Sequence, residues 1–153
     1  MNTNTTAPNE VVKECIDTCN SLLRGELSAV ETYQKAIDKF DDDVFVTQLK
    51  DLQRSHMDSV SELRKHVIEM NGSPENDSGA WGNFANGVQS AANFFGDNAA
   101  LSSLEAGEAY GQKDYENALE KDIMPEARAL IQTTLLPRCR RNQEILDALE
   151  EAA

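Results

Sequence analysis

The sequence is poor in basic residues and has no long hydrophobic run. Its 153 residues include 14 lysines and arginines against 27 aspartates and glutamates, a net charge of −13. Because a field of that sign repels a phosphate backbone, we expect no nucleic acid partner. No apolar run approaches the ~18 residues of a transmembrane helix, and the polar opening MNTNTTAPNE does not resemble a secretory signal. We therefore expect a cytoplasmic protein with no membrane association.

Cysteine is also scarce, and its three copies make an odd number. Cys15 and Cys19 are four residues apart, which on one helix face gives poor geometry for a disulfide. Cys139 should lie about 16 Å along the bundle from Cys15, so these two should not pair either. Unpaired, buried thiols suit a reducing compartment.

Apolar residues recur every three or four positions along most of the chain, the spacing of a helix with one buried face. This spacing predicts helices over residues 9–40, 43–71, 98–121 and 124–150, with a kink at Pro137. No segment shows the alternation of a β-strand. We expect residues 1–8 to be a disordered tail and residues 9–153 to form a single domain.

Residues 79–95 carry a further aromatic segment at helical spacing. As a helix it would span ~25 Å, which is nearly the length of a bundle. It could therefore return the chain from one end of the molecule to the other between the second and third helices. The predicted fold is all-α: an antiparallel four-helix bundle of two helical hairpins joined by one long helical crossover.

Four polar residues occupy positions where these helices should bury apolar side chains: Glu26, His56, Glu108 and Asn142. Glu26 and His56 are each fifteen residues from Asp41 at the first hairpin turn, so they should lie at one level. Glu108 and Asn142 are sixteen and eighteen residues from Met124 at the second turn. The four should therefore meet in one layer, where an unpartnered carboxylate would cost several kcal/mol.

These positions carry a family resemblance. The segment GELSAVETY at 25–33 resembles the first-helix motif of bacterioferritins and related ferritin-like proteins, and QRSH at 53–56 is similar to their Glu-x-x-His. LEAGEAYGQKDY at 104–115 resembles their third helix, whereas CRRN at 139–142 stands where a second Glu-x-x-His belongs. Over residues 10–150 the pattern is similar to a small bacterial branch of the superfamily, known as domain of unknown function 2383.

The resemblance implies a dimetal site that is only partly present. Its implied metal ligands are Glu26, His56 and Glu108, with Gln53, Cys139 and Asn142 at the remaining ligand positions. A complete dimetal carboxylate site takes four acidic side chains and two histidines. Only two carboxylates and one imidazole occupy those positions here.

Three interpretations of this layer follow. It could be a residual dinuclear site, or a mononuclear Fe or Zn site with Cys139 as fourth ligand. In the third interpretation, which we favour, no cofactor binds and an arginine neutralises the glutamates, with Arg54, Arg138 and Arg141 as candidates. We thus predict a non-catalytic binding or structural protein rather than an enzyme, whose partner is another protein or a second copy in a homodimer. The alternative is a metal-binding protein or metal-dependent oxidoreductase.

Overall fold

The computed structural model describes residues 7–79 and 96–152, and within these ranges the structure is helical, without strands. Helices α1 (Ala7–Ile37) and α2 (Asp43–Glu69) form the first half. The second half contains α4 (Asp97–Leu119) and a continuous helical rod made of α5 (Pro125–Leu130), a π-helical turn (Ile131–Leu135) and α6 (Leu136–Ala152). None of the described helices is long and apolar enough to cross a membrane.

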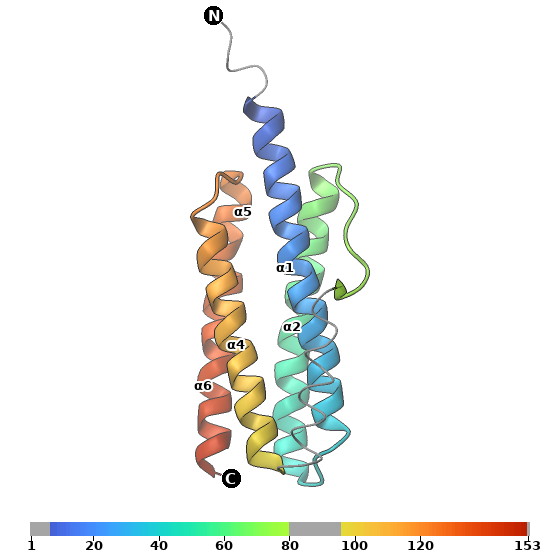
Figure 1. The fold of residues 1–153 in the computed structure, drawn as a ribbon, viewed down its shortest axis with the longest axis vertical. Coiled ribbons are helices and arrows are strands. Elements are labelled where there is room, and N and C mark those ends of the chain that lie inside the picture. Colours follow the sequence, from blue (N-terminus) through green and yellow to red (C-terminus); the bar gives the residue numbers. More distant parts are fainter. Residues whose placement is uncertain (1–6, 80–95, 153) are drawn as a thin grey trace, which may run out of the picture.

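The helices lie along one another in two pairs (Figure 1). A short turn joins α1 to α2, which run in opposite directions and share the most extensive interface. Another short turn joins α4 to α5, and α6 then packs back along α4. Further contacts between α1 and α4 and between α2 and α6 bring the two pairs together.

The predicted helices are present, with ends that differ by a few residues. The first begins at Ala7 rather than residue 9 and ends at Ile37 rather than residue 40. Phe40 nevertheless stays buried, and its backbone N–H donates to the carbonyl of Ala36 at 3.1 Å. The predicted crossover over 79–95 lies, apart from Gly79, outside the described residues, as does most of the predicted tail.

Asp42 fixes the start of α2. Its side chain accepts hydrogen bonds from the backbone N–H of Val44 at 2.8 Å and of Phe45 at 3.3 Å. These are two of the donors that a helix start leaves without an intrahelical partner. The cap therefore sets where α2 begins, and with it the level reached by residues further along that helix.

Near Pro137, where the sequence predicts a kink, the structure has a π-helical turn that directly precedes α6. Proline has no N–H to donate, and its ring crowds the carbonyl four residues earlier. A wider turn with bonds to the fifth residue relieves both problems, so the helical rod continues through Pro137 instead of ending there.

A polar layer divides the apolar core into two clusters. One cluster is centred on Leu23, Leu63 and Ile131, and the other on Leu49, Leu101 and Leu146, all at most 1% exposed. The three cysteines are buried and form no disulfide, as the spacing predicts. Within the layer between the clusters lie the polar residues that the sequence places inside the helical stripes.

Candidate functional site

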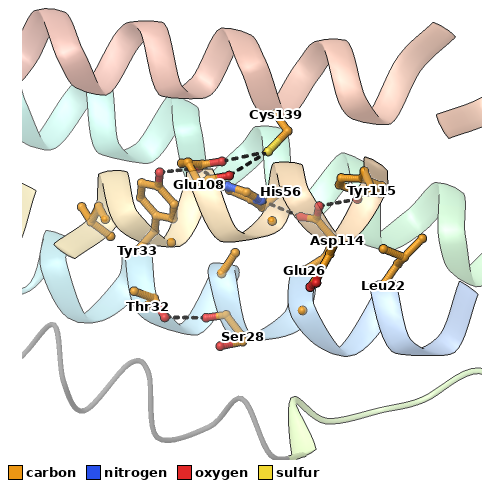
Figure 2. Close-up of a pocket in the computed structure, with 15 residues that line it drawn as sticks. Leu22, Glu26, Ser28, Thr32, Tyr33, His56, Glu108, Asp114, Tyr115 and Cys139 are labelled. Atoms are coloured by element: carbon orange, nitrogen blue, oxygen red, sulfur yellow. Dashed lines mark hydrogen bonds and ion pairs between the residues drawn. The ribbon is translucent and has the colours of Figure 1, made fainter. Parts of the chain in front are cut away.

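The centre of the polar layer is a row of three side chains from three helices. His56 on α2 lies between Glu26 on α1 and Glu108 on α4 (Figure 2). Its Nδ1 is 2.5 Å from Oε2 of Glu26, and its Nε2 is 2.6 Å from Oε1 of Glu108. The three are only 7, 5 and 3% exposed in the order Glu26, His56, Glu108. We call this row the Glu–His–Glu cluster.

Two buried tyrosines donate hydrogen bonds to the Glu–His–Glu cluster. The hydroxyl of Tyr115 donates to Oε1 of Glu26 at 2.5 Å, and that of Tyr33 donates to Oε1 of Glu108 at 2.6 Å. Each tyrosine thus bonds to the glutamate of the other helix. In the sequence, each tyrosine comes seven residues after the glutamate of its own helix. The ring of Tyr33 also packs against His56, with 5.2 Å between ring centroids.

The other sequence-predicted positions divide into two groups. Cys139 and Asn142 on α6 lie beside the cluster: the thiol is 3.5 Å from Oε2 of Glu108, and the amide nitrogen is 3.5 Å from Nε2 of His56. When Nε2 carries a proton, these two nitrogens are both donors, and the Asn142 contact is then no hydrogen bond. Gln53 does not join the cluster. Its amide donates to the carbonyl of Val30 at 3.0 Å and to the side chain of Gln34 at 3.1 Å.

The predicted arginine partner is wrong. Arg138 turns to α2, where its guanidinium donates to both carboxylate oxygens of Glu62 at 2.9 and 3.2 Å and to Ser59 at 2.9 Å. Arg141 is exposed, and the side chain of Arg54 is 75% exposed. Glu62 offers Arg138 a bidentate partner on α2, and the side chains of Arg138 and Glu62 remain 18 and 36% exposed, so the guanidinium is less deeply buried there than it would be beside Glu26 and Glu108.

The cation that faces both glutamates is His56 itself. Burial alone would lower the pKa of His56, but the negative charges of Glu108 and Glu26 raise it well above its usual 6.5. Burial in turn raises the pKa of Glu108, yet the opposing charge of His56 outweighs it, and the net shift is downward. A protonated imidazole donates from both ring nitrogens, which matches its two short contacts with carboxylate oxygens. Two carboxylates and one imidazolium leave one net negative charge.

The tyrosines stay neutral in this environment. Burial, followed by the charge of Glu108, raises the pKa of Tyr33 well above 10, and burial with the charge of Glu26 does the same for Tyr115. Both are therefore hydroxyl donors at physiological pH. They satisfy carboxylate oxygens without adding or removing charge.

Neither tyrosine was singled out from the sequence, because both stand at the apolar spacing of their helices, where a core residue is expected. A signal was available. A buried tyrosine needs a partner for its hydroxyl, and Glu26/Tyr33 and Glu108/Tyr115 share a spacing of seven residues, two helical turns. Since the glutamates were placed in one layer, the tyrosines next to that layer had acidic partners within reach.

A cavity of about 60 Å³ adjoins the cluster, mainly between α1 and α4. Its walls are mostly small or apolar residues, including Gly25, Ala29, Gly107 and Gly111. The charged groups that reach it are Glu26, His56, Glu108 and Asp114, and its polar lining adds the two tyrosines, Ser28 and Thr32. Since a single water needs roughly 10–15 Å³ of such volume, the cavity can hold several atoms.

The donor geometry bears on metal binding. A histidine binds a metal through the lone pair of an unprotonated ring nitrogen, and both nitrogens of His56 contact carboxylates. Over residues 7–79 and 96–152, no three His, Cys, Asp or Glu side chains are arranged to hold a metal ion. Gln53, at a position implied as a ligand, faces away toward Val30.

Among the comparisons with known proteins, a family model gives the match, and this match covers residues from all three helices of the cluster. No curated protein and no solved structure matches the chain. One family model matches residues 14–121, a stretch that contains Glu26, His56 and Glu108 but ends before Cys139 and Asn142. The match spans more than half of the chain, and the protein belongs to the family described as a domain of unknown function (DUF2383).

Proposed function

We propose that the protein is a ferritin-like bundle with a non-catalytic binding or structural role, in which protonated His56 stands where related bundles hold metal. The order of two helical pairs, with a long connection between α2 and α4, supports the ferritin-like arrangement (Figure 1). The three buried, unpaired cysteines support a cytoplasmic location, since a reducing compartment keeps such thiols free.

One observation carries this proposal: both ring nitrogens of His56 lie within 2.6 Å of a carboxylate oxygen. A dimetal centre needs four carboxylates to offset most of its charge and a lone pair from each imidazole. The cluster has two carboxylates and a histidine whose raised pKa favours the protonated form. The residues therefore do not fit a dimetal centre, and we assign them no metal-dependent reaction.

In this proposal the cluster specifies how the helices pack. It connects α1, α2 and α4 through charge-assisted hydrogen bonds, which are shorter and stronger than neutral ones. A shift of one helix by a single turn would separate His56 from at least one glutamate and leave a buried charge without its partner. The layer thus favours one register among those that the apolar clusters alone would allow.

The proton on His56 can be observed directly by NMR of protein labelled with nitrogen-15. The chain has only two histidines, so His66→Gln leaves a single set of ring signals, from His56. At pH 8 we expect protons on both ring nitrogens of His56. A neutral ring with one unprotonated nitrogen would contradict the proposal.

Metal titration provides the second test. Protein purified without an affinity tag should contain no stoichiometric metal, and added Fe²⁺ or Zn²⁺ should leave the melting temperature unchanged. An ion that binds the folded state would stabilise it by about 2.7 kcal/mol at a hundredfold excess over Kd. Such a gain, lost in both Glu26→Ala and His56→Ala, would overturn the proposal.

The alternative is a metal-binding protein, or a metal-dependent oxidoreductase, with a mononuclear Fe or Zn site. The proximity of the Cys139 thiol to Glu108, at 3.5 Å, favours it, because carboxylate, imidazole and thiolate together suit Zn²⁺. Burial raises the pKa of Cys139, however, and the charges of Glu108 and Glu26 raise it further. Metal binding would therefore have to remove protons from both His56 and Cys139, and proton release on adding Zn²⁺ would support this alternative.

A further inference from the structure

The cavity between α1 and α4 has walls that suit an organic ligand. Small and apolar side chains line most of it, together with a few charged groups. This is the usual composition of a small-molecule site. A bare metal ion instead requires oxygen, nitrogen or sulfur ligands on all sides.

Gly25 keeps this space open from within a helix. A Cβ atom built at Gly25 would meet no described atom within 4 Å, whereas one at Gly111 would lie 3.7 Å from the thiol of Cys139. Glycine inside a helix costs roughly 0.5–1 kcal/mol relative to alanine. Gly25 does not allow closer packing against any described neighbour. The local effect of the glycine is a wider cavity beside Glu26.

The charge at the cavity is negative. The Glu–His–Glu cluster has one carboxylate more than it has cations, and Asp114 adds another at the same cavity. No hydrogen bond to the Asp114 side chain is found among the described residues. Burial raises the pKa of Asp114 above the usual 3.8, and the charge of Lys121 opposes part of that shift. Glu26 accepts one hydrogen bond at each oxygen, so each retains a lone pair for another donor.

We propose that this cavity binds the ammonium head of a small primary amine, with Asp114 and Glu26 as its charge partners and the small residues of α1 and α4 around its first carbons. An ammonium group offers three N–H donors and one positive charge, which complements the acceptors and the excess charge. Tyr33 and Tyr115 line the same space, and aromatic rings attract such cations. The alkyl chain would lie against Leu22, Ala29 and Leu104, which also line the cavity.

The test compares n-butylammonium with n-butanol, a neutral molecule of the same length, and with K⁺, a cation without an alkyl chain. Binding is followed by NMR of the backbone amides of the full chain, in the presence of a chelator. We expect saturable shifts at Gly25, Gly111 and Asp114 with butylammonium at about millimolar Kd, and no saturable shifts with n-butanol or K⁺. Equal binding of n-butanol, binding of K⁺ at the same amides, or no saturation by butylammonium would each overturn the proposal.

Variants separate the charge from the space. Asp114→Asn keeps the shape and should weaken butylammonium binding about tenfold, the loss expected for one charged hydrogen bond. Asp51→Asn removes the same charge from an exposed position on α2 and should change binding little. Gly25→Leu should abolish binding by filling the cavity, and Gly25→Ala, which adds one carbon, should weaken it. Wild-type affinity in a folded Gly25→Leu or in Asp114→Asn would overturn the assignment.

Discussion

Replacement of His56 by glutamine removes the positive charge of the cluster and retains a polar side chain of similar length. Two contacts at 2.5 and 2.6 Å to carboxylates are lost or become neutral. Hydrogen bonds to charged groups contribute about 1.5–3 kcal/mol each, and breaking a buried ion pair by removing one partner costs about 3–5 kcal/mol. Because Glu26 and Glu108 are both buried, we expect His56→Gln to destabilise the metal-free protein by about 3–5 kcal/mol.

Urea unfolding with a chelator present measures this loss, and His66→Gln on the same helix is the matched control. The control should change stability by less than about 0.5 kcal/mol, as is usual away from buried networks. For a chain of this size the His56→Gln loss should lower the melting temperature by roughly 6–20 °C. A loss below about 1 kcal/mol would refute the reasoning, because it would show that the glutamates do not depend on His56 for their charge balance.

The same variant has a pH signature. The pKa of His56 is higher in the folded protein than its usual 6.5. Its contribution to stability is therefore fully present below pH 6.5 and is lost as pH rises through the folded pKa. Glu108 acts in the opposite sense: its pKa is lowered, so its contribution is present above pH 4.5 and is lost as pH falls through the folded value. The difference between wild type and His56→Gln should thus shrink at high pH, and a difference that grows there would contradict the assigned charges.

Four other substitutions test the surroundings of the cluster by urea unfolding. Tyr33→Phe and Tyr115→Phe each remove a hydroxyl donor from a buried carboxylate and should cost about 1.5–3 kcal/mol; losses below about 0.5 kcal/mol would mean that the hydroxyls do not bond as described. Gly25→Ala should raise stability by about 0.5–1 kcal/mol, because alanine favours the helix and its Cβ meets no described atom within 4 Å; a loss would mean that the space is already filled. Arg138→Ala should cost about 1.5–3 kcal/mol, because it removes hydrogen bonds to the Glu62 carboxylate and to buried Ser59; a loss as large as that of His56→Gln would restore the arginine interpretation.

The helices could be predicted from apolar spacing because each buries one face along most of its length. The ends of the helices could be predicted less accurately, since apolar spacing indicates which residues are buried and not which backbone conformation they have. Phe40 illustrates the difference: it continues the apolar stripe and is buried, yet α1 ends three residues earlier. The hydrogen bond from its backbone to Ala36 holds it in the turn, so a residue can face the core from just beyond a helix.

The level of the polar residues could also be predicted, because helical rise converts residue counts into depth. Counting from the turns brought Glu26, His56 and Glu108 to one layer, where the structure joins them. The identity of the neutralising cation could not be obtained by counting. Arg138 is close to that level, but a long side chain can turn to either edge of its helix, and a bidentate partner at Glu62 is available there.

The charge balance of the cluster follows from a difference between the two helical pairs, α1 with α2 and α4 with α6. Glu26 and Tyr33 on α1 have the same spacing as Glu108 and Tyr115 on α4, and the two helices run in opposite directions (Figure 1). Each tyrosine therefore reaches the glutamate of the other helix. The partner helices do not match, because α2 supplies His56 where α6 supplies the neutral Asn142. Two equivalent carboxylates thus share one imidazole. Its two ring nitrogens point in opposite directions, so one protonated ring can donate to both carboxylates. One negative charge is left without a partner, and it lies beside the cavity.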